Sequence, residues 1–154
     1  MEKNKALFLD RDGVINIETN YVFKISDFIF IPEIFKIIKK YQDKGFLIFV
    51  ITNQAGIARN YYTEKDVIKL NNWMVEKFRE KGIIINEVYF CPHHPDFTGE
   101  CECRKPKPGM ILEAIKKYNI DPAKSVLIGD KESDIMAGIN AKIGKNIYIH
   151  DLLN

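Results

Sequence analysis

Five short, continuous runs of apolar residues alternate with longer amphipathic segments along this chain of 154 residues. The runs are residues 6–9, 46–51, 83–90, 126–128 and 147–149. A strand inside a parallel sheet is covered on both faces, so it needs apolar residues at every position instead of at alternate ones. The alternation of such runs with helical segments predicts an open α/β sheet whose parallel strands are joined by helices.

Four amphipathic helices are expected between these runs. One begins at Pro32 and ends before Gly45, and a second begins at residues 63–66, where Thr-Glu-Lys-Asp resembles a capping box. A third begins at Pro108, and a shorter one covers residues 133–141. In the longer segments apolar residues recur at spacings of three and four, which is typical of a helix with one buried face.

Polar or metal-binding residues follow four of the five expected strands: Asp10, Thr52, Cys91 and Asp130. Because ligands of open α/β sheets bind at the carboxyl ends of the strands, we expect these residues to share one site. Residues 13–31, directly after the first strand, fit no regular element and are long for a connection. Long loops beside a strand end are often functional.

The charge balance argues against nucleic acid or a membrane surface as a partner, because 23 basic and 21 acidic residues leave a formal net charge of +2. No apolar run approaches the roughly 20 residues of a membrane span, and residues 1–5 are too polar for a signal peptide. We therefore expect one cytoplasmic domain over residues 1–154, acting as a monomer without nucleic acid or membrane.

Two carboxylates, Asp10 and Asp12, are crowded where the first strand ends, and Gly13 follows them. Residues two apart in an extended chain point the same way, so the acids repel each other unless a cation joins them or one binds a proton. Asp130, at another strand end, offers a third carboxylate, and hard oxygen ligands of this kind suit Mg²⁺. The competing interpretation is a solvated acidic turn, which Thr52 and Asp130 at other strand ends disfavour.

Four motifs in order give the sequence a resemblance to the haloacid-dehalogenase-like (HAD) phosphohydrolases. They are Phe-Leu-Asp-Arg-Asp-Gly at 8–13, Ile-Thr-Asn-Gln at 51–54, Arg-Lys-Pro at 104–106 and Gly-Asp-Lys-Glu-Ser-Asp at 129–134. One Asp-x-Asp pair is a weak signal, whereas four ordered motifs at strand ends are a strong one. The resemblance implies a three-layer, Rossmann-like α/β fold with a mostly parallel five-stranded sheet, helices on both faces and no large cap domain.

The resemblance also assigns roles to residues of these motifs. Asp10 would attack phosphorus and form an aspartyl-phosphate, while Asp12 would protonate the leaving alcohol and then deprotonate the attacking water. The Thr52 hydroxyl and the Lys105 ammonium would hold the phosphoryl oxygens. Mg²⁺ would be bound by the Asp10 side chain, the Asp12 backbone carbonyl and the Asp130 side chain.

Each of these roles has a structural competitor. Thr52 could cap a turn, and Lys105 could be a solvated charge at the rim of a site. For Asp134, an acid in the first turn of the last helix is the preferred interpretation. It lies one helical turn beyond Asp130, where a negative charge stabilises the helix dipole.

All three cysteines fall within residues 91–103, together with two histidines. In a reducing compartment an odd number of cysteines favours metal binding or reactivity over a disulfide framework. Three thiolates and an imidazole match a tetrahedral, structural Zn²⁺ site, and free thiols beside a surface histidine pair are the alternative. Spacing leaves His93 and His94 equally possible. The family resemblance selects His93, with Cys91, Cys101 and Cys103.

A closed zinc site would have no open coordination position, so we assign it to shaping the loop and not to chemistry. The loop runs directly into Arg104 and Lys105. Fixing the loop would therefore fix these two cations beside the phosphoryl site.

The zinc loop narrows the resemblance to two families, the D-glycero-D-manno-heptose-1,7-bisphosphate 7-phosphatases and the histidinol-phosphate phosphatases. The sequence is more similar to the first over about residues 6–141, on stretches 18–22, 52–59, 91–95, 104–110 and 129–131. The loop between His93 and Cys101 is short and closer to the second family. Histidinol phosphate is therefore the alternative substrate. A polynucleotide 3′-phosphate ranks below both, because no basic groove or stacking aromatics stand out.

The first resemblance implies removal of the 7-phosphate from a heptose 1,7-bisphosphate, a step towards nucleotide-activated heptose for lipopolysaccharide core or surface glycan. Arg104 and Lys131, each adjacent to an expected site residue, are candidates for the second phosphate. They could instead only offset nearby carboxylates. The full set of expected substrate-binding residues is Glu18, Thr19, Asn20, Tyr21, Asn53, Gln54, Ala55, Arg59, Arg104 and Lys131.

Overall fold

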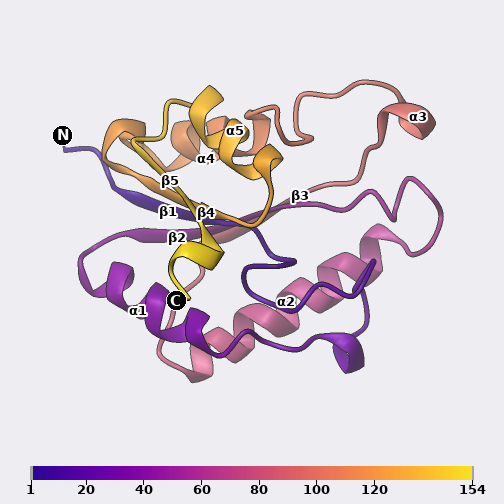
Figure 1. Ribbon diagram of the computed structural model, residues 1–154, viewed down its shortest axis with the longest axis horizontal. Helices are drawn as coiled ribbons and strands as arrows, with labels where there is room; N and C mark the ends of the chain where they lie inside the picture. Colours follow the sequence, from indigo (N-terminus) through magenta and orange to yellow (C-terminus); the bar gives the residue numbers. More distant parts are fainter. Residues whose placement is uncertain (1, 154) are drawn as a thin grey trace.

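The computed structural model describes residues 2–153 and contains one five-stranded sheet (Figure 1). The strands are β1 Ala6–Leu9, β2 Leu47–Asn53, β3 Glu87–Cys91, β4 Val126–Gly129 and β5 Lys145–Tyr148. They lie in the order β3-β2-β1-β4-β5, and every neighbouring pair is parallel. The open parallel sheet expected from the alternation of apolar runs is confirmed.

Helices cover both faces of the sheet, which gives the expected three layers (Figure 1). One face is covered by α1 Glu33–Asp43 and α2 Glu64–Glu80, and the other by α4 Gly109–Tyr118 and α5 Glu132–Asn140. Strand residues point alternately into the two cores: Leu7 and Leu9 into the first, and Ala6 and Phe8 into the second. All four residues of β1 are fully buried, which explains why the run is apolar at every position.

The starts of α2 and β3 can be compared with the starts expected from the sequence. The Thr63 side chain accepts a hydrogen bond from the Asp66 N–H at 3.2 Å, and Asp66 accepts one from the Thr63 N–H at 2.9 Å, which confirms the capping box of α2. The third strand, however, begins at Glu87 and not at Ile83 as expected. Ladder pairing starts only after Asn86, whose side chain and backbone both bond to Ile48.

Residues 13–31 are more ordered than the sequence indicates. They contain a 3-10 turn, η1 Ile25–Asp27, and a short antiparallel pairing. In this pairing the Ile17 N–H donates to the Ile29 carbonyl and the Ile31 N–H donates to the Ile15 carbonyl, both at 2.8 Å. The loop is therefore closed on itself, which a search for strand or helix periods along the sequence cannot detect.

The sheet places the ends of β1 and β4 side by side at the point where the strand order reverses. Leu9 pairs with Ile128, and the Asp10 N–H donates to the Ile128 carbonyl at 3.2 Å. At the other end of β1, the Ala6 N–H donates to the buried hydroxyl of Ser125 at 3.0 Å. The residues that follow β1 and β4 are thus held next to each other, as expected for a ligand site of an open α/β sheet.

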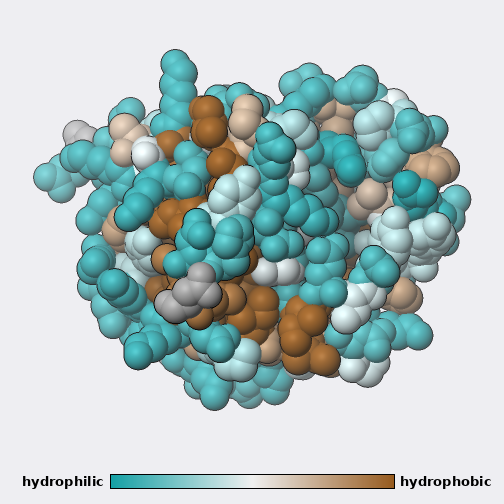
Figure 2. Space-filling model, viewed as in Figure 1, coloured by the Kyte–Doolittle hydropathy of each residue, from teal (hydrophilic) through white to brown (hydrophobic). Residues whose placement is uncertain are grey.

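The surface on the side drawn in Figure 2 is mainly hydrophilic, with separate apolar patches. The exposed apolar side chains include Leu152 and Leu153, directly after the turn η3 Ile149–Asp151. Within residues 2–153, no helix has the length and apolar character that crossing a bilayer requires.

Candidate active site

The ammonium group of Lys105 joins two buried carboxylates at the carboxyl edge of the sheet. Its Nζ lies 2.8 Å from Asp10 Oδ1, forms an ion pair with Asp134, and donates to the Ile51 carbonyl at 3.0 Å. Lys105 is only 4% exposed and Asp134 only 2%. Three acceptors thus match the three N–H donors of an ammonium group that would otherwise be costly to bury.

Electrostatics distinguish the two carboxylates around Lys105. Burial raises the pKa of Asp10 to about 7, although Lys105 acts in the opposite direction. Burial also disfavours the charged forms of Lys105 and Asp134, but charge attraction outweighs it and raises the pKa of Lys105 while lowering that of Asp134. Lys105 therefore compensates Asp134 more fully than Asp10. A further cation beside Asp10 would complete the balance.

Asp134 is an acid in the first turn of α5, as expected, and its two carboxylate oxygens have different partners. Its Oδ2 accepts hydrogen bonds from the N–H groups of Asp130 and Lys131 at 2.9 and 3.0 Å. Its Oδ1 faces Lys105. The structure therefore confirms that Asp134 is a first-turn acid of α5. It also shows an ion pair with Lys105, which the position of Asp134 in its helix does not predict.

The carboxylate of Asp12 is held by three side chains. Its Oδ1 accepts from Arg11 Nη2 at 3.1 Å and from Asn16 Nδ2 at 3.0 Å, and its Oδ2 accepts from Gln54 Nε2 at 3.1 Å. Arg11 is fully buried, and its Nη1 donates to Asn71 Oδ1 on α2 at 3.1 Å. These contacts fix Asp12 in one orientation. Of the residues that make them, only Gln54 was among the site residues expected from the sequence.

Asp130 faces the turn that follows Asp12. Gly13 has a φ of +91°, and a Cβ at this position would clash with the Asp130 carboxylate. Glycine therefore permits both the backbone conformation and the close approach of the turn. Burial and the nearby Glu18 raise the pKa of Asp130. Asp10 and Asp130, two carboxylates with raised pKa values at adjacent strand ends, offer oxygen donors that fit a hard divalent cation such as Mg²⁺.

A cavity of about 520 Å³ opens at this edge of the sheet, and Asp130 is not among the residues that line it. Asp10, Asp12 and Lys105 line it, whereas Thr52 does not and is only 1% exposed. The expected substrate-binding residues that line it are Glu18, Asn20, Tyr21, Asn53, Gln54, Ala55, Arg104 and Lys131.

Two expected substrate-binding residues lie elsewhere. Thr19 is exposed, and Arg59 places its guanidinium 4.9 Å from the ring centre of Phe97. Four residues line the cavity without having been expected to bind substrate: Tyr62, Pro106, Ser133 and Asp134. Tyr62 gave no sequence signal, because it reaches the cavity only through a chain reversal after β2.

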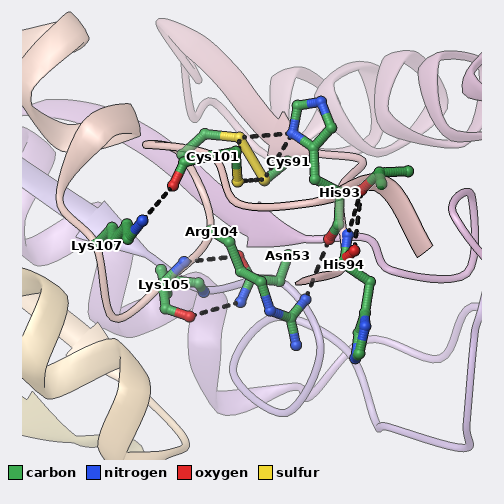
Figure 3. The surroundings of a disulfide bond; sticks show 10 residues. Asn53, Cys91, His93, His94, Cys101, Arg104, Lys105 and Lys107 are labelled. Atoms are coloured by element: carbon green, nitrogen blue, oxygen red, sulfur yellow. Dashed lines mark hydrogen bonds between the residues drawn. A yellow bond between two sulfur atoms is a disulfide. The ribbon is translucent and has the colours of Figure 1, made fainter. Parts of the chain in front are cut away.

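The segment with Arg104 and Lys105 is attached to its surroundings at three points (Figure 3). The Asn53 side chain accepts from the Lys105 N–H at 3.0 Å and donates to the Lys105 carbonyl at 3.3 Å. Arg104 Nη1 donates to the His93 carbonyl at 3.3 Å. The end of β2 and the cysteine loop therefore fix these two cations together.

Three cysteines and one histidine converge near the segment that carries Arg104 and Lys105 (Figure 3). The ligand atoms of Cys91, His93, Cys101 and Cys103 all lie within 4.8 Å of one another. His94 points elsewhere, because its Nδ1 accepts from the backbone of the short helix α3 Pro95–Thr98 at 3.1 Å. The cluster has the donor types and compactness of a tetrahedral zinc site.

Cys91 and Cys103 form a disulfide in this structure, and Cys101 is a free thiol. This pairing differs from the expectation, based on the odd cysteine count, that no disulfide forms. The convergence itself is the physical reason: thiols brought this close together can either be oxidised or share one metal ion.

Comparisons with known proteins agree with this geometry. A family model described as HAD-hydrolase-like matches residues 102–145. The chain is 51% identical over 146 residues to a D-glycero-alpha-D-manno-heptose-1,7-bisphosphate 7-phosphatase of Photorhabdus laumondii, covering 92% of this chain and 80% of that protein. It is 43% identical over 150 residues to a D-glycero-beta-D-manno-heptose-1,7-bisphosphate 7-phosphatase of Haemophilus influenzae, covering 95% and 82% of the two proteins.

A solved structure is similar over nearly the whole fold. The D,D-heptose 1,7-bisphosphate phosphatase from B. bronchiseptica, crystallised with magnesium and phosphate, matches with a TM-score of 0.83 at 29% identity. The match covers 92% of this chain and 78% of that one. Sequence identity over most of both relatives, together with this fold, shows that the chain belongs to the D-glycero-D-manno-heptose-1,7-bisphosphate 7-phosphatase family of HAD-like hydrolases.

Proposed function

We propose that this protein hydrolyses the 7-phosphate of a D-glycero-D-manno-heptose 1,7-bisphosphate and leaves the heptose 1-phosphate. The observation that supports this best is the distribution of charge in the cavity. Lys105 is buried beside Asp10, while Arg104 and Lys131 line the same cavity with side chains that are at least partly exposed. Separate cations for two phosphates suit a small sugar bisphosphate.

The chemistry proposed for the floor takes place in two displacements. In the first, the Asp10 carboxylate forms a bond to phosphorus, the bond from phosphorus to the sugar oxygen breaks, and Asp12 donates a proton to that oxygen. In the second, water attacks the aspartyl-phosphate, Asp12 accepts a proton from the water, and Asp10 and inorganic phosphate are released. Lys105 would hold the phosphoryl oxygens during both displacements. The same role for Thr52 stays a prediction, because Thr52 does not line the cavity.

Mg²⁺ is the proposed cofactor, held by the Asp10 side chain, the Asp12 backbone carbonyl and the Asp130 side chain. When bound, it neutralises charge on the transferring phosphoryl group. The raised pKa of Asp10, to about 7, supports this proposal, because a buried carboxylate that must act as an anion needs more positive charge than Lys105 provides.

Recognition of the sugar and of the second phosphate is proposed for the remaining cavity residues. Lys131 Nζ lies 3.3 Å from Glu18 Oε1, so the two form an ion pair that a phosphate could open. Among residues 2–153, Arg104 Nη2 has no hydrogen-bond partner and could bind a phosphate while Nη1 donates to the His93 carbonyl. Thr19 and Arg59 stay predictions, because neither lines the cavity.

The two alternative substrates, histidinol phosphate and a polynucleotide 3′-phosphate, have less support. The names of the relatives favour a heptose bisphosphate over histidinol phosphate. A polynucleotide 3′-phosphate would need a basic groove, and the formal net charge is only +2. We place the enzyme in the cytoplasm as a single-domain monomer over residues 1–154, on the pathway to nucleotide-activated heptose.

Zn²⁺ is proposed as a structural metal in the reduced protein, bound by Cys91, His93, Cys101 and Cys103. The loop of residues 91–103 holds the His93 carbonyl against Arg104, and Lys107 Nζ donates to the Cys101 carbonyl at 2.8 Å. A metal in the loop would therefore position residues of the active site without touching the substrate.

The substrate assignment predicts a selective effect of Arg104→Ala. Loss of one charge-assisted contact to the distal phosphate should lower kcat/KM for the heptose bisphosphate by about 10- to 100-fold. The loss should be much smaller for 4-nitrophenyl phosphate, which has no second phosphate. Steady-state kinetics on both esters, on histidinol phosphate and on a 3′-phosphorylated oligonucleotide measure this.

The matched control is Arg79→Ala, because Arg79 lies on the exposed side of α2 and pairs only with Glu76 among the described residues. Its kinetics should equal those of the wild type. Equal losses on both esters in Arg104→Ala would contradict a role in recognition. A wild-type preference for histidinol phosphate would overturn the substrate assignment.

The raised pKa of Asp10 predicts that Mg²⁺ binds more tightly as the pH rises. With a pKa of about 7, Asp10 is mostly protonated at pH 6 and mostly ionised at pH 8, and Mg²⁺ must displace the proton. The association constant should therefore increase by about tenfold between these values. Isothermal titration calorimetry without substrate measures it, and in Asp10→Asn the binding should be weak and nearly independent of pH. A flat profile in the wild type would contradict the assignment of Asp10 as a ligand.

The zinc proposal predicts a contrast between two neighbouring histidines. Protein purified under reducing conditions without added metal should contain one zinc per chain, and His93→Asn should lose it together with thermal stability. His94→Asn keeps an acceptor for the first turn of α3 and should retain the zinc. Elemental analysis and thermal unfolding measure both. Wild-type protein without zinc but with full activity would refute the proposal.

A further inference from the structure

Tyr62 lines the cavity, yet it belongs to none of the motifs that resemble the family. It is 6% exposed, and its hydroxyl lies 2.6 Å from Gln54 Oε1. Burial raises the pKa of Tyr62 to about 12, so the phenol keeps its proton at neutral pH. The hydroxyl therefore donates and Gln54 Oε1 accepts, which fixes the direction of this hydrogen bond.

The direction of that bond determines what Gln54 can offer on its other side. With Oε1 facing Tyr62, the Nε2 group donates to Asp12 Oδ2 at 3.1 Å and to Thr52 Oγ1 at 2.9 Å. A reversed amide would place its oxygen against the Asp12 carboxylate, and two acceptors repel each other. Gln54 is 2% exposed, so water cannot readily correct a reversed amide.

We propose that Tyr62 is a positioning residue that orients the Gln54 amide and, through it, the carboxylate of Asp12. This inference rests on the proposed function only where it assigns proton transfer to Asp12. Tyr62 acts indirectly, since its hydroxyl bonds to Gln54 and to none of the expected catalytic side chains. Its effect should therefore appear in the steps in which Asp12 transfers a proton, and kcat/KM reports the first of these, the protonation of the leaving alcohol.

The surroundings of Tyr62 hold its ring in one place. The ring stacks on Phe23, with centroids 4.8 Å apart and planes 16° apart. Gly56 lies against the other part of the ring, and a Cβ there would penetrate the ring. The Tyr61 N–H donates to the Gly56 carbonyl at 2.9 Å, which closes the chain reversal that brings Tyr62 back to the cavity. Residues 13–31 thus support Asp12 from a distance through Phe23 and Tyr62.

The test compares Tyr62→Phe with Tyr61→Phe. Both variants keep the ring and lose one hydroxyl, but Tyr61 is 54% exposed and packs its ring against Tyr21. The kinetic readout is kcat/KM for an alkyl phosphate, whose leaving oxygen needs a proton, against 4-nitrophenyl phosphate, whose leaving group does not. General acid catalysis typically contributes about 10²–10⁴-fold, so Tyr62→Phe should lose about tenfold or more on the alkyl ester. It should lose less than about threefold on the aryl ester, and Tyr61→Phe should match the wild type on both.

Equal losses on the two esters would overturn the proposal, because they would indicate general damage or an effect through Thr52. Gln54→Met provides a second variant: it has a similar size but neither accepts from Tyr62 nor donates to Asp12, so the same difference between esters is expected. Thermal unfolding of each variant shows whether it is folded at the assay temperature.

A readout without turnover separates this inference from the proposed function. In ¹⁵N NMR spectra, the side-chain amide protons of Gln54 should exchange slowly with water in the wild type and in Tyr61→Phe. They should exchange faster in Tyr62→Phe, because the amide has lost its fixed partner. Unchanged exchange in Tyr62→Phe would overturn the inference. Slow wild-type exchange in a protein that hydrolyses no phosphate ester would refute only the proposed function.

Discussion

A buried lysine between two carboxylates is the interaction on which the site depends. Burying a charge is costly unless it is paired, and removing one partner of such a group is typically worth several kcal/mol. Asp10 comes from the end of β1, Asp134 from the first turn of α5, and Lys105 from the segment between β3 and α4. The parallel strand order brings the ends of these elements to one edge of the sheet, where the three charges meet.

Hydrogen bonds to its backbone also keep Lys105 in place. The amide of Asn53 binds both the N–H and the carbonyl of Lys105, and Arg104 is tied to the cysteine loop through the His93 carbonyl. A phosphoryl site relies mainly on positioning and charge, so rigid support of this kind contributes directly to rate. The cysteine loop thus helps to position the active site, although none of its three cysteines lines the cavity.

The sequence predicted what depends on local patterns. Continuous apolar runs predicted the strands. Because ligands bind at the carboxyl ends of parallel strands, the sequence also predicted that Asp10, Thr52 and Asp130 lie at one edge of the sheet. The contacts of Asp134 and Tyr62 could not be predicted, because they join segments that no spacing rule relates. Helical position explained Asp134 only in part, and the reversal at Gly56 that returns Tyr62 to the cavity depends on tertiary packing. Local physics therefore determined the elements, while long-range contacts determined the fine positions of the reacting groups.

We propose that Asp10 becomes covalently phosphorylated during turnover. Acid quenching during turnover, followed by borohydride reduction, converts an aspartyl-phosphate to homoserine, which peptide mass spectrometry can locate. We expect homoserine at position 10 in the wild type, only in the presence of substrate and Mg²⁺, and none in Asp10→Asn, which should be folded but inactive. Substantial turnover by Asp10→Asn, or homoserine at another aspartate with none at position 10, would contradict the account.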